Sequence, residues 1–223
     1  MRERLGLCFL LLLSPGCRNV PPSVLQAERT ASPQVTAAAD PLAPVLPPRN
    51  AADRIVNRAK DEARRGVMYD ASYRRLSYPG GDVPLDRGAC TDVVVRSLRA
   101  AGVDLQRNIH EDMAAHYDRY PHNWDIRHPD ANIDHRRGAN HIAYFRRHAR
   151  ALPIDLTRVG LPTWEPGDIV YWKLGNSLDH CGVISNVRNA QGIPLVIHNI
   201  GQARQEDCLA AWKIVAHFRY PVP

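Results

Sequence analysis

Three residues of this chain have the types and the order that nucleophilic catalysis by a thiol requires. Cys90 lies at the head of a segment with helical apolar periodicity, 86–102, and His180 and His198 lie in two later strand-like segments. A thiol is a good nucleophile only when it ionises, and both a helix N-terminus and a nearby imidazolium lower its pKa. The pattern predicts that Cys90 attacks and that His180 exchanges protons as the general base.

His198 is predicted to orient His180. The two strand-like segments should pair as a hairpin about the turn near residue 190, which places both imidazoles near the same end of adjacent strands. His198 would then hydrogen-bond the second ring nitrogen of His180 and hold its tautomer. Asn199 is the rival for this role, but strand alternation turns it to the opposite face. A reversed assignment, with His198 as the base, also stays open.

The same residues fit a purely structural interpretation. The chain has 10 histidines, so some fall near any chosen cysteine by chance. A single cysteine at a helix start is often a small buried apolar residue. The residue pattern alone therefore leaves a catalytic and a structural Cys90 both open.

Attack on a carbonyl group needs hydrogen-bond donors for the oxyanion that forms. The backbone N–H of Cys90 at the helix start is the first candidate. The hydroxyls of Tyr69 and Tyr78 are further candidates, although either ring could simply pack. Thr91 and Asn199 complete the set of residues expected near the oxyanion or the substrate.

Neither a metal nor another cofactor is expected. His110 and Glu111 begin like a zinc-peptidase helix, but the next histidine is His116. Zinc ligands on one helix face need a spacing of four, and a spacing of six points the two rings to nearly opposite faces. The arginines at 136–137 and 146–147 are expected on solvated faces, although Arg136 could also meet a substrate carboxylate.

Residues 1–17 are expected to be a signal peptide. A charged start precedes an apolar run at 5–13, which is too short to span a bilayer. Cys17 follows a segment that resembles the cleavage box of bacterial lipoproteins, so lipid attachment at Cys17 and ordinary cleavage both stay open. We expect an exported, periplasmic or envelope-associated protein, which contacts the membrane only through such an anchor.

The segment 18–50 is expected to be a disordered linker, because it has seven prolines and no aromatic residue. A single α+β domain is expected at 51–223. Helices are predicted at 51–65 (between Asn50 and Gly66), 86–102, 108–120 and 139–149. Strands are predicted near 168–173, 180–187, 194–200 and 213–220.

The net charge of +6 predicts anionic surroundings. For an exported protein these are acidic cell-wall polymers and anionic lipids. Nucleic acid is not an expected partner, because no long basic run with interleaved aromatic residues occurs. Three cysteines follow the linker, and a disulfide between Cys181 and Cys208, which would leave Cys90 free, stays open.

The order of motifs resembles that of the NlpC-type cell-wall cysteine peptidases. After the Cys90 helix come 165-EPGDIVYW-172, 180-HCGVIS-185 and 196-VIHN-199, which match a Pro-Gly-Asp strand, a His-x-Gly strand and an apolar-apolar-His strand of that family. The resemblance implies a papain-like α+β fold with N-terminal helices packed on an antiparallel sheet. It also implies that Cys90, His180 and His198 cleave an amide bond in peptidoglycan peptides.

Longer segments, 76–102, 132–137 and 195–201, resemble the bacterial domain of unknown function 1287 family, over about residues 51–220. That resemblance implies the same papain-like clan. Two features depart from the NlpC pattern: Ala89-Cys90-Thr91-Asp92 replaces the usual Asp-Cys-Ser-Gly, and about 103–150 forms an insertion. The expected function is a cysteine hydrolase, and the alternative is a non-catalytic envelope-binding domain on the same fold.

Overall fold

The computed structural model describes residues 40–122, 128–175 and 178–222. The expected signal peptide, the lipidation site Cys17 and most of the expected linker lie outside the described residues. The chain divides into two units, 1–38 and 39–223, and the described structure belongs to the second. Within the described ranges, no helix has the length and apolar character needed to cross a bilayer.

Four α-helices make up the helical part of the domain: α1 (Ala51–Arg65), α2 (Cys90–Ala100), α3 (Leu105–Ala115) and α4 (Gly138–His148). The expected bounds of α1 are confirmed, because Asn50 accepts a hydrogen bond from the Asp53 N–H at 2.8 Å and Gly66 ends the helix with a φ of 58°. Three single 3₁₀ turns are described as well: η1 (Tyr117–Arg119), η3 (Asp134–Arg136) and η4 (Leu161–Thr163).

The expected start of the third helix at Asn108 is wrong. α3 begins at Leu105, because the Asp104 side chain accepts hydrogen bonds from the N–H groups of Gln106 and Arg107 at 3.1 and 3.4 Å. Asp is as good a helix cap as Asn, so the earlier cap determines the start.

Six strands form one antiparallel sheet in the order β3-β8-β4-β5-β6-β7. Their bounds are β3 (Arg150–Ala151), β4 (Ile169–Leu174), β5 (Leu178–Arg188), β6 (Pro194–Asn199), β7 (Ala203–Glu206) and β8 (Lys213–Arg219). Two further strands, β1 (Met68–Tyr69) and β2 (Arg87–Gly88), pair in parallel outside this sheet. The four expected strands and the α+β class are confirmed, whereas β7 was not predicted because its sequence has no apolar alternation.

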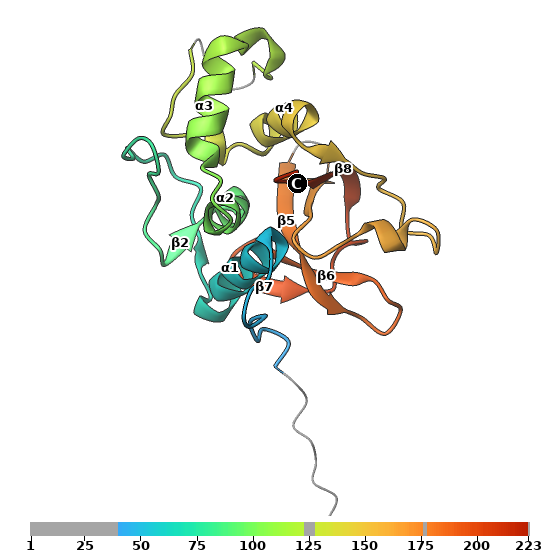
Figure 1. Ribbon diagram of the computed structural model, residues 1–223. Coiled ribbons are helices and arrows are strands. Elements are labelled where there is room, and N and C mark those ends of the chain that lie inside the picture. The colour runs from blue at the N-terminus through green and yellow to red at the C-terminus, as the bar shows by residue number, and fades with distance from the viewer. Residues whose placement is uncertain (1–39, 123–127, 176–177, 223) are drawn as a thin grey trace, which may run out of the picture. The chain divides into compact units, whose positions relative to one another are not determined.

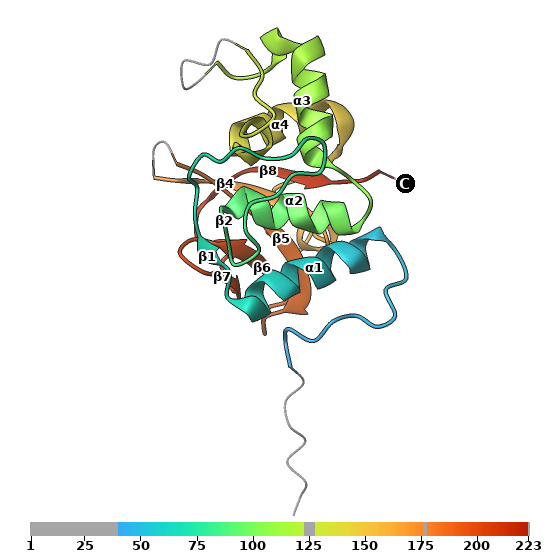
Figure 2. The ribbon, with the colours of Figure 1, turned by 90° about the vertical axis from the view of Figure 1, so that its left-hand side faces the viewer.

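The sheet is apolar on both faces, which explains why its strands read as nearly continuous apolar runs. α1 and α2 lie side by side over one face, as Figures 1 and 2 show. Alternate residues of each strand point to this face, and among them Tyr171 and Cys181 pack into one core with the helices. Their neighbours in the strands, such as Trp172 and Ile184, pack into a second core on the other face.

Residues 103–150, expected as an insertion, belong to the first of these cores. Ile109 and Met113 of α3 and Phe145 of α4 are buried in the same cluster as α2 and the sheet. The segment is therefore a structural part of the domain, and it lies next to the start of α2 and the adjoining part of β5.

The last part of the expected linker, 40–50, packs along α1. Val45 and Asn57 exchange two hydrogen bonds, of 2.7 and 2.8 Å, and Lys60 donates to the Ala43 carbonyl at 2.9 Å. The composition of this segment could not reveal the attachment, because the polar partners come from α1. Residues 40–50 therefore belong to the folded domain and not to the expected linker.

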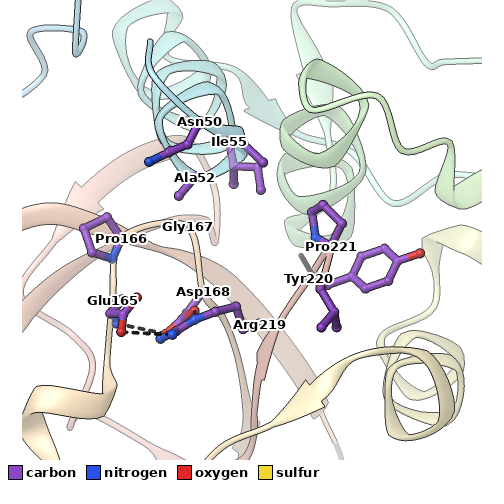
Figure 3. A pocket seen from close by; sticks show the side chains of 12 residues that line it. Asn50, Ala52, Ile55, Glu165, Pro166, Gly167, Asp168, Arg219, Tyr220 and Pro221 are labelled. Carbon is purple, nitrogen blue, oxygen red and sulfur yellow. Dashed lines mark hydrogen bonds and ion pairs between the residues drawn. The ribbon is translucent and has the colours of Figure 1, made fainter.

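The Pro-Gly-Asp motif joins α1 to the sheet. Gly167 has a φ of 88°, and a Cβ there would lie 3.0 Å from the Cα of Ala52. Asp168 is buried and accepts hydrogen bonds from His217 at 2.8 Å and from Arg219 at 2.7 Å. Figure 3 shows Asp168 and Glu165 beside Arg219 in a cavity of about 370 Å³ between the start of α1 and the end of the chain.

Asp168→Asn should destabilise the domain by roughly 3–5 kcal/mol, because it removes the charge of a buried carboxylate that both His217 and Arg219 bind. Glu165→Gln is the matched control, because Glu165 binds the same Arg219 at 2.9 Å from a largely exposed position. Its loss should cost less than about 1 kcal/mol. Urea unfolding followed by circular dichroism measures both, and equal losses would contradict the structural role of Asp168.

Candidate active site

Cys90 is the first residue of α2, and the turn that precedes it is held by Asp92. The Asp92 carboxylate accepts a hydrogen bond from the Ala89 N–H at 2.6 Å. Gly88 permits this close approach, because a Cβ there would lie 2.9 Å from the Cβ of Asp92. The thiol is thus placed in the first turn of the helix, where the N–H groups have no helical partner and the helix dipole favours negative charge.

Arg136 fixes Asp92 in turn. Its guanidinium binds both carboxylate oxygens of Asp92, at 3.0 and 2.9 Å, and donates to the carbonyls of Ser72 and Asp70 at 2.7 and 2.9 Å. The expectation that Arg136 lies on a solvated face is wrong, because this ion pair is buried. Thr91, expected near the substrate, is also buried and donates to the Arg136 carbonyl at 3.1 Å.

The surroundings of Cys90 stabilise a thiolate. The pKa of Cys90 is lowered to about 5. A hydrogen bond from the Cys181 thiol lowers it most, and burial raises it. A hydrogen bond with His180 and the positive charge of that imidazole lower it further. Burial raises the pKa of the Cys181 thiol well above its usual range, which keeps that thiol protonated as a donor. All three cysteines of the described ranges, Cys90, Cys181 and Cys208, are free thiols.

His180 and His198 are hydrogen-bonded, with 2.8 Å between Nε2 of His180 and Nδ1 of His198. β5 and β6 pair with Gly182 opposite His198, so the two imidazoles are diagonal neighbours on one face of the sheet. Gly182 leaves room for this contact, because a Cβ there would lie 3.1 Å from the Cβ of His198. Because Nε2 of His180 makes this bond, Nδ1 is the ring nitrogen of His180 that is available to the thiol.

Glu206, which was not predicted from the sequence, continues this chain of hydrogen bonds. Its carboxylate lies 2.8 Å from Nε2 of His198. Burial and the neighbouring His180 lower the pKa of His198. A neutral His198 therefore donates from Nε2 to Glu206 and accepts at Nδ1 from His180. Nothing in the sequence around β7 marked Glu206, because the pairing of β7 with β6 determines its position.

Two tryptophans enclose the histidine pair. The ring of Trp172 stacks on His180 with 5.6 Å between the ring centroids. Trp212 meets His180 edge-on at 5.7 Å and His198 at 6.0 Å. Trp172 lies directly opposite His180 in the β4–β5 pair, so the position of one ring could have been inferred from the other. These aromatic walls exclude water from the hydrogen bonds between the imidazoles.

The structure separates the two tyrosines that the sequence offered as oxyanion donors. Tyr69 pairs with Gly88, two residues before Cys90, and is partly exposed. Burial, together with the negative charge of the Cys90 thiolate, raises the pKa of Tyr69, so its hydroxyl stays protonated and can donate near the thiol. Tyr78 instead packs edge-on against His110 of α3, with ring centroids 5.2 Å apart.

Asn199 lies away from the histidine pair, as strand alternation predicts. Its side-chain amide donates to the carbonyls of Val67 and Gly88, both at 3.0 Å. It therefore ties β6 to the β1–β2 ribbon that carries Tyr69 and precedes Cys90. Asn199 supports the site without replacing His198.

Among the described residues, one group has the donor set of a metal site: His198, Glu206 and Cys208, with ligand atoms within 4.8 Å of one another. This group was not predicted from the sequence. Burial raises the pKa of Cys208 to about 12, and His198 already binds both His180 and Glu206. The arrangement as it stands is that of a hydrogen-bonded chain with a neutral thiol beside it.

Cys181→Ala should raise the pKa of Cys90, because it removes the hydrogen bond that contributes most to its lowering. In the wild type, the rate of alkylation of Cys90 by iodoacetamide should fall to half near pH 5 as the thiolate is protonated. In the variant this midpoint should move up by roughly one to two pH units. Mass spectrometry of the Cys90 peptide measures the rate.

Cys208→Ala is the matched control, because Cys208 is a buried thiol in the other core. Its alkylation midpoint should stay near that of the wild type. An unchanged midpoint in Cys181→Ala would show that the second thiol does not stabilise the Cys90 thiolate.

Comparison with known proteins identifies the family and no activity. The chain is similar to the uncharacterized protein YijF of Escherichia coli (strain K12), with 47% identity over 167 residues, which is 74% of this chain and 80% of that protein. No solved structure matches the chain. The family model for the domain of unknown function DUF1287 matches residues 56–220. With most of its length covered in this way, the chain belongs to the DUF1287 family.

Proposed function

We propose that this protein is a cysteine hydrolase with a papain-like fold that cleaves an amide bond. The observation that carries the proposal is the hydrogen-bonded line His180–His198–Glu206 next to Cys90, whose thiol has its pKa lowered to about 5. A thiol that needs only to be buried gains nothing from a lowered pKa. Nucleophilic catalysis requires it, because the thiolate is the attacking form.

In the first half of the reaction, the Cys90 thiolate attacks the carbonyl carbon of the amide. The Cys90 N–H and the Tyr69 hydroxyl donate hydrogen bonds to the oxyanion. Nδ1 of His180 then gives its proton to the amine as the C–N bond breaks, which leaves a thioester on Cys90. In the second half, His180 takes a proton from water, the hydroxide attacks the thioester, and the thiolate is released with a carboxylic acid as product.

His198 and Glu206 keep His180 ready for both proton transfers. The carboxylate holds the proton of His198 on Nε2, so Nδ1 of His198 always presents a lone pair to Nε2 of His180. Because Nε2 of His180 is held in this way, the ring keeps Nδ1 directed toward the thiol. His198 and Glu206 are thus positioning residues in the proposed mechanism.

The proposed substrate is a peptide of the bacterial cell wall, met after export. The apolar run at 5–13, the proline-rich segment that follows and the net charge of +6 support an exported protein among anionic envelope polymers. The match of the strand motifs to NlpC-type peptidases supports peptidoglycan stem peptides or cross-links as the bond that is cleaved.

One observation favours a second function, a non-catalytic binding domain for the envelope on the same fold. Cys90 is only 7% exposed, and buried cysteines are commonly inert. In that case the chain of hydrogen bonds would serve stability alone.

The wild-type chain should digest purified muropeptides into pairs of fragments that together carry one added water, and Cys90→Ala should leave them intact. Mass spectrometry of the products measures this, and Cys208→Ala is the control that removes a buried thiol from outside the proposed mechanism. Intact muropeptides with both proteins, combined with equal binding by both, would favour the binding domain.

Substitution of the two histidines should have unequal effects. His180→Ala removes the proton acceptor and should lower kcat/KM by roughly 10²- to 10⁴-fold. His198→Ala leaves the base in place but free to rotate, so its loss should be smaller by a factor of about ten to a hundred. His198→Asn should recover part of the activity, because an amide oxygen can still accept the bond from Nε2 of His180.

Circular dichroism of each variant checks that the domain remains folded, since both histidines are buried. Equal and complete losses without rescue by His198→Asn would assign the base to His198, or a shared structural role to both rings.

A further inference from the structure

A basic pocket lies beside the candidate active site. It has a volume of about 620 Å³ and is walled by α4, by the turn at 119–121 and by the adjoining ends of β4, β5 and β8. Four of its side chains are cationic, namely Arg119, Arg146, Arg147 and Lys173, and one, Asp179, is anionic.

The four cationic side chains of this pocket differ in how far carboxylates neutralise their charge. Arg147 is paired with Asp112 and lies over the ring of Tyr120, and Lys173 is paired with Asp179. Arg119 meets the exposed carboxylate of Asp118 at 3.5 Å. Within the described ranges Arg146 is exposed and makes no ion pair. Among the described residues, these two arginines are therefore the ones available to bind an anion from outside the chain.

The pocket is linked to the thiol through β5, because its lining residue Asp179 precedes Cys181 by two positions. Asp179 and Cys181 point to the same face of β5, about 7 Å apart along the strand, and Cys181 is buried in the same core as Cys90. Asp179 is also the neighbour of His180 in the chain. A peptide extends by about 3.3–3.6 Å per residue, so a group that enters this pocket past Asp179 lies more than two residues from a carbonyl at Cys90.

The remaining walls of the pocket are apolar. Ile142, Ala139 and Val215 line it together with the ring of Tyr120. A ligand that fits has a short aliphatic portion and an anionic end. Arginine binds planar carboxylates in a bidentate manner, so a carboxylate of a peptide matches this lining.

We propose that this pocket binds a free carboxylate of the substrate peptide, more than two residues from the bond that Cys90 attacks. This rests on the proposed function for the role of the pocket in cleavage, but the binding of the carboxylate can be tested without cleavage. Arg146 is the principal determinant, and Arg119 assists it.

The test measures binding first, with the full chain carrying Cys90→Ala so that no cleavage occurs. The probes are a fluorescein-labelled stem tetrapeptide with a free C-terminal carboxylate and the same peptide as a C-terminal amide, compared by fluorescence anisotropy. The carboxylate should bind roughly fivefold more tightly, as expected for one exposed arginine pair. The preference should weaken as salt is raised.

Adding Arg146→Gln should remove the preference for the carboxylate and leave binding of the amide unchanged. Arg150→Gln is the matched control, an exposed arginine four residues further on and outside the pocket. In the active protein, Arg146→Gln should raise KM for the carboxylate peptide without changing kcat, because Arg146 does not contact the reacting atoms.

The outcomes separate the two proposals. If the Cys90→Ala chain prefers the carboxylate but the wild type cleaves neither peptide, the hydrolase proposal fails and the pocket assignment stands. If the wild type cleaves both peptides equally well, or if Arg146→Gln keeps the preference, the pocket assignment fails. Loss of binding to vesicles of phosphatidylglycerol and phosphatidylcholine in Arg146→Gln, with no discrimination between the peptides, would overturn it in favour of a lipid surface.

Discussion

The carboxylate of Asp92 is the constraint on which the candidate site depends. It caps the turn before Cys90 through the Ala89 N–H, and it receives the guanidinium of Arg136, which also holds the carbonyls of Ser72 and Asp70. One buried ion pair therefore joins the helix that bears the thiol, the loop that follows Tyr69 and the segment before α4. Removing either charge would leave the other buried and unpaired, which costs several kcal/mol, so these three parts of the chain keep their relative positions.

A second constraint comes from the sheet, where three adjacent strands each supply one group of a single hydrogen-bonded line. His180, His198 and Glu206 belong to β5, β6 and β7, and the backbone pairing fixes each offset by two residues. Regular strand pairing is more rigid than a loop, so the line needs few additional supports. The rings of Trp172 and Trp212 keep water from it, and bonds between the imidazoles are strengthened in such surroundings.

Local signals in the sequence were enough to find part of this arrangement. The Asn50 cap fixes the start of α1, and helical periodicity and strand alternation brought Cys90, His180 and His198 together. What the sequence could not reveal depends on partners far along the chain. From the sequence, Arg136 is expected to be solvated, because its partner Asp92 is 44 positions away in the chain. Glu206 lies in β7, which forms by pairing with the edge of β6. The sequence of β7 has no apolar alternation that would predict a strand.

The alternation of β5 carries a further consequence for folding. His180 and Cys181 are consecutive, and they point to opposite faces of a sheet whose two sides are both buried. A slip of this strand by one residue against β4 would exchange them, so that an imidazole would enter the helical core and a thiol would face Trp172. Gly182 would move as well, and a side chain would then lie where His198 needs an empty space. A chain with this strand out of register would lose its packing and its thiol–imidazole contact together. Cellular quality control that recognises exposed apolar surface would therefore also remove the molecules that lack the assembled site.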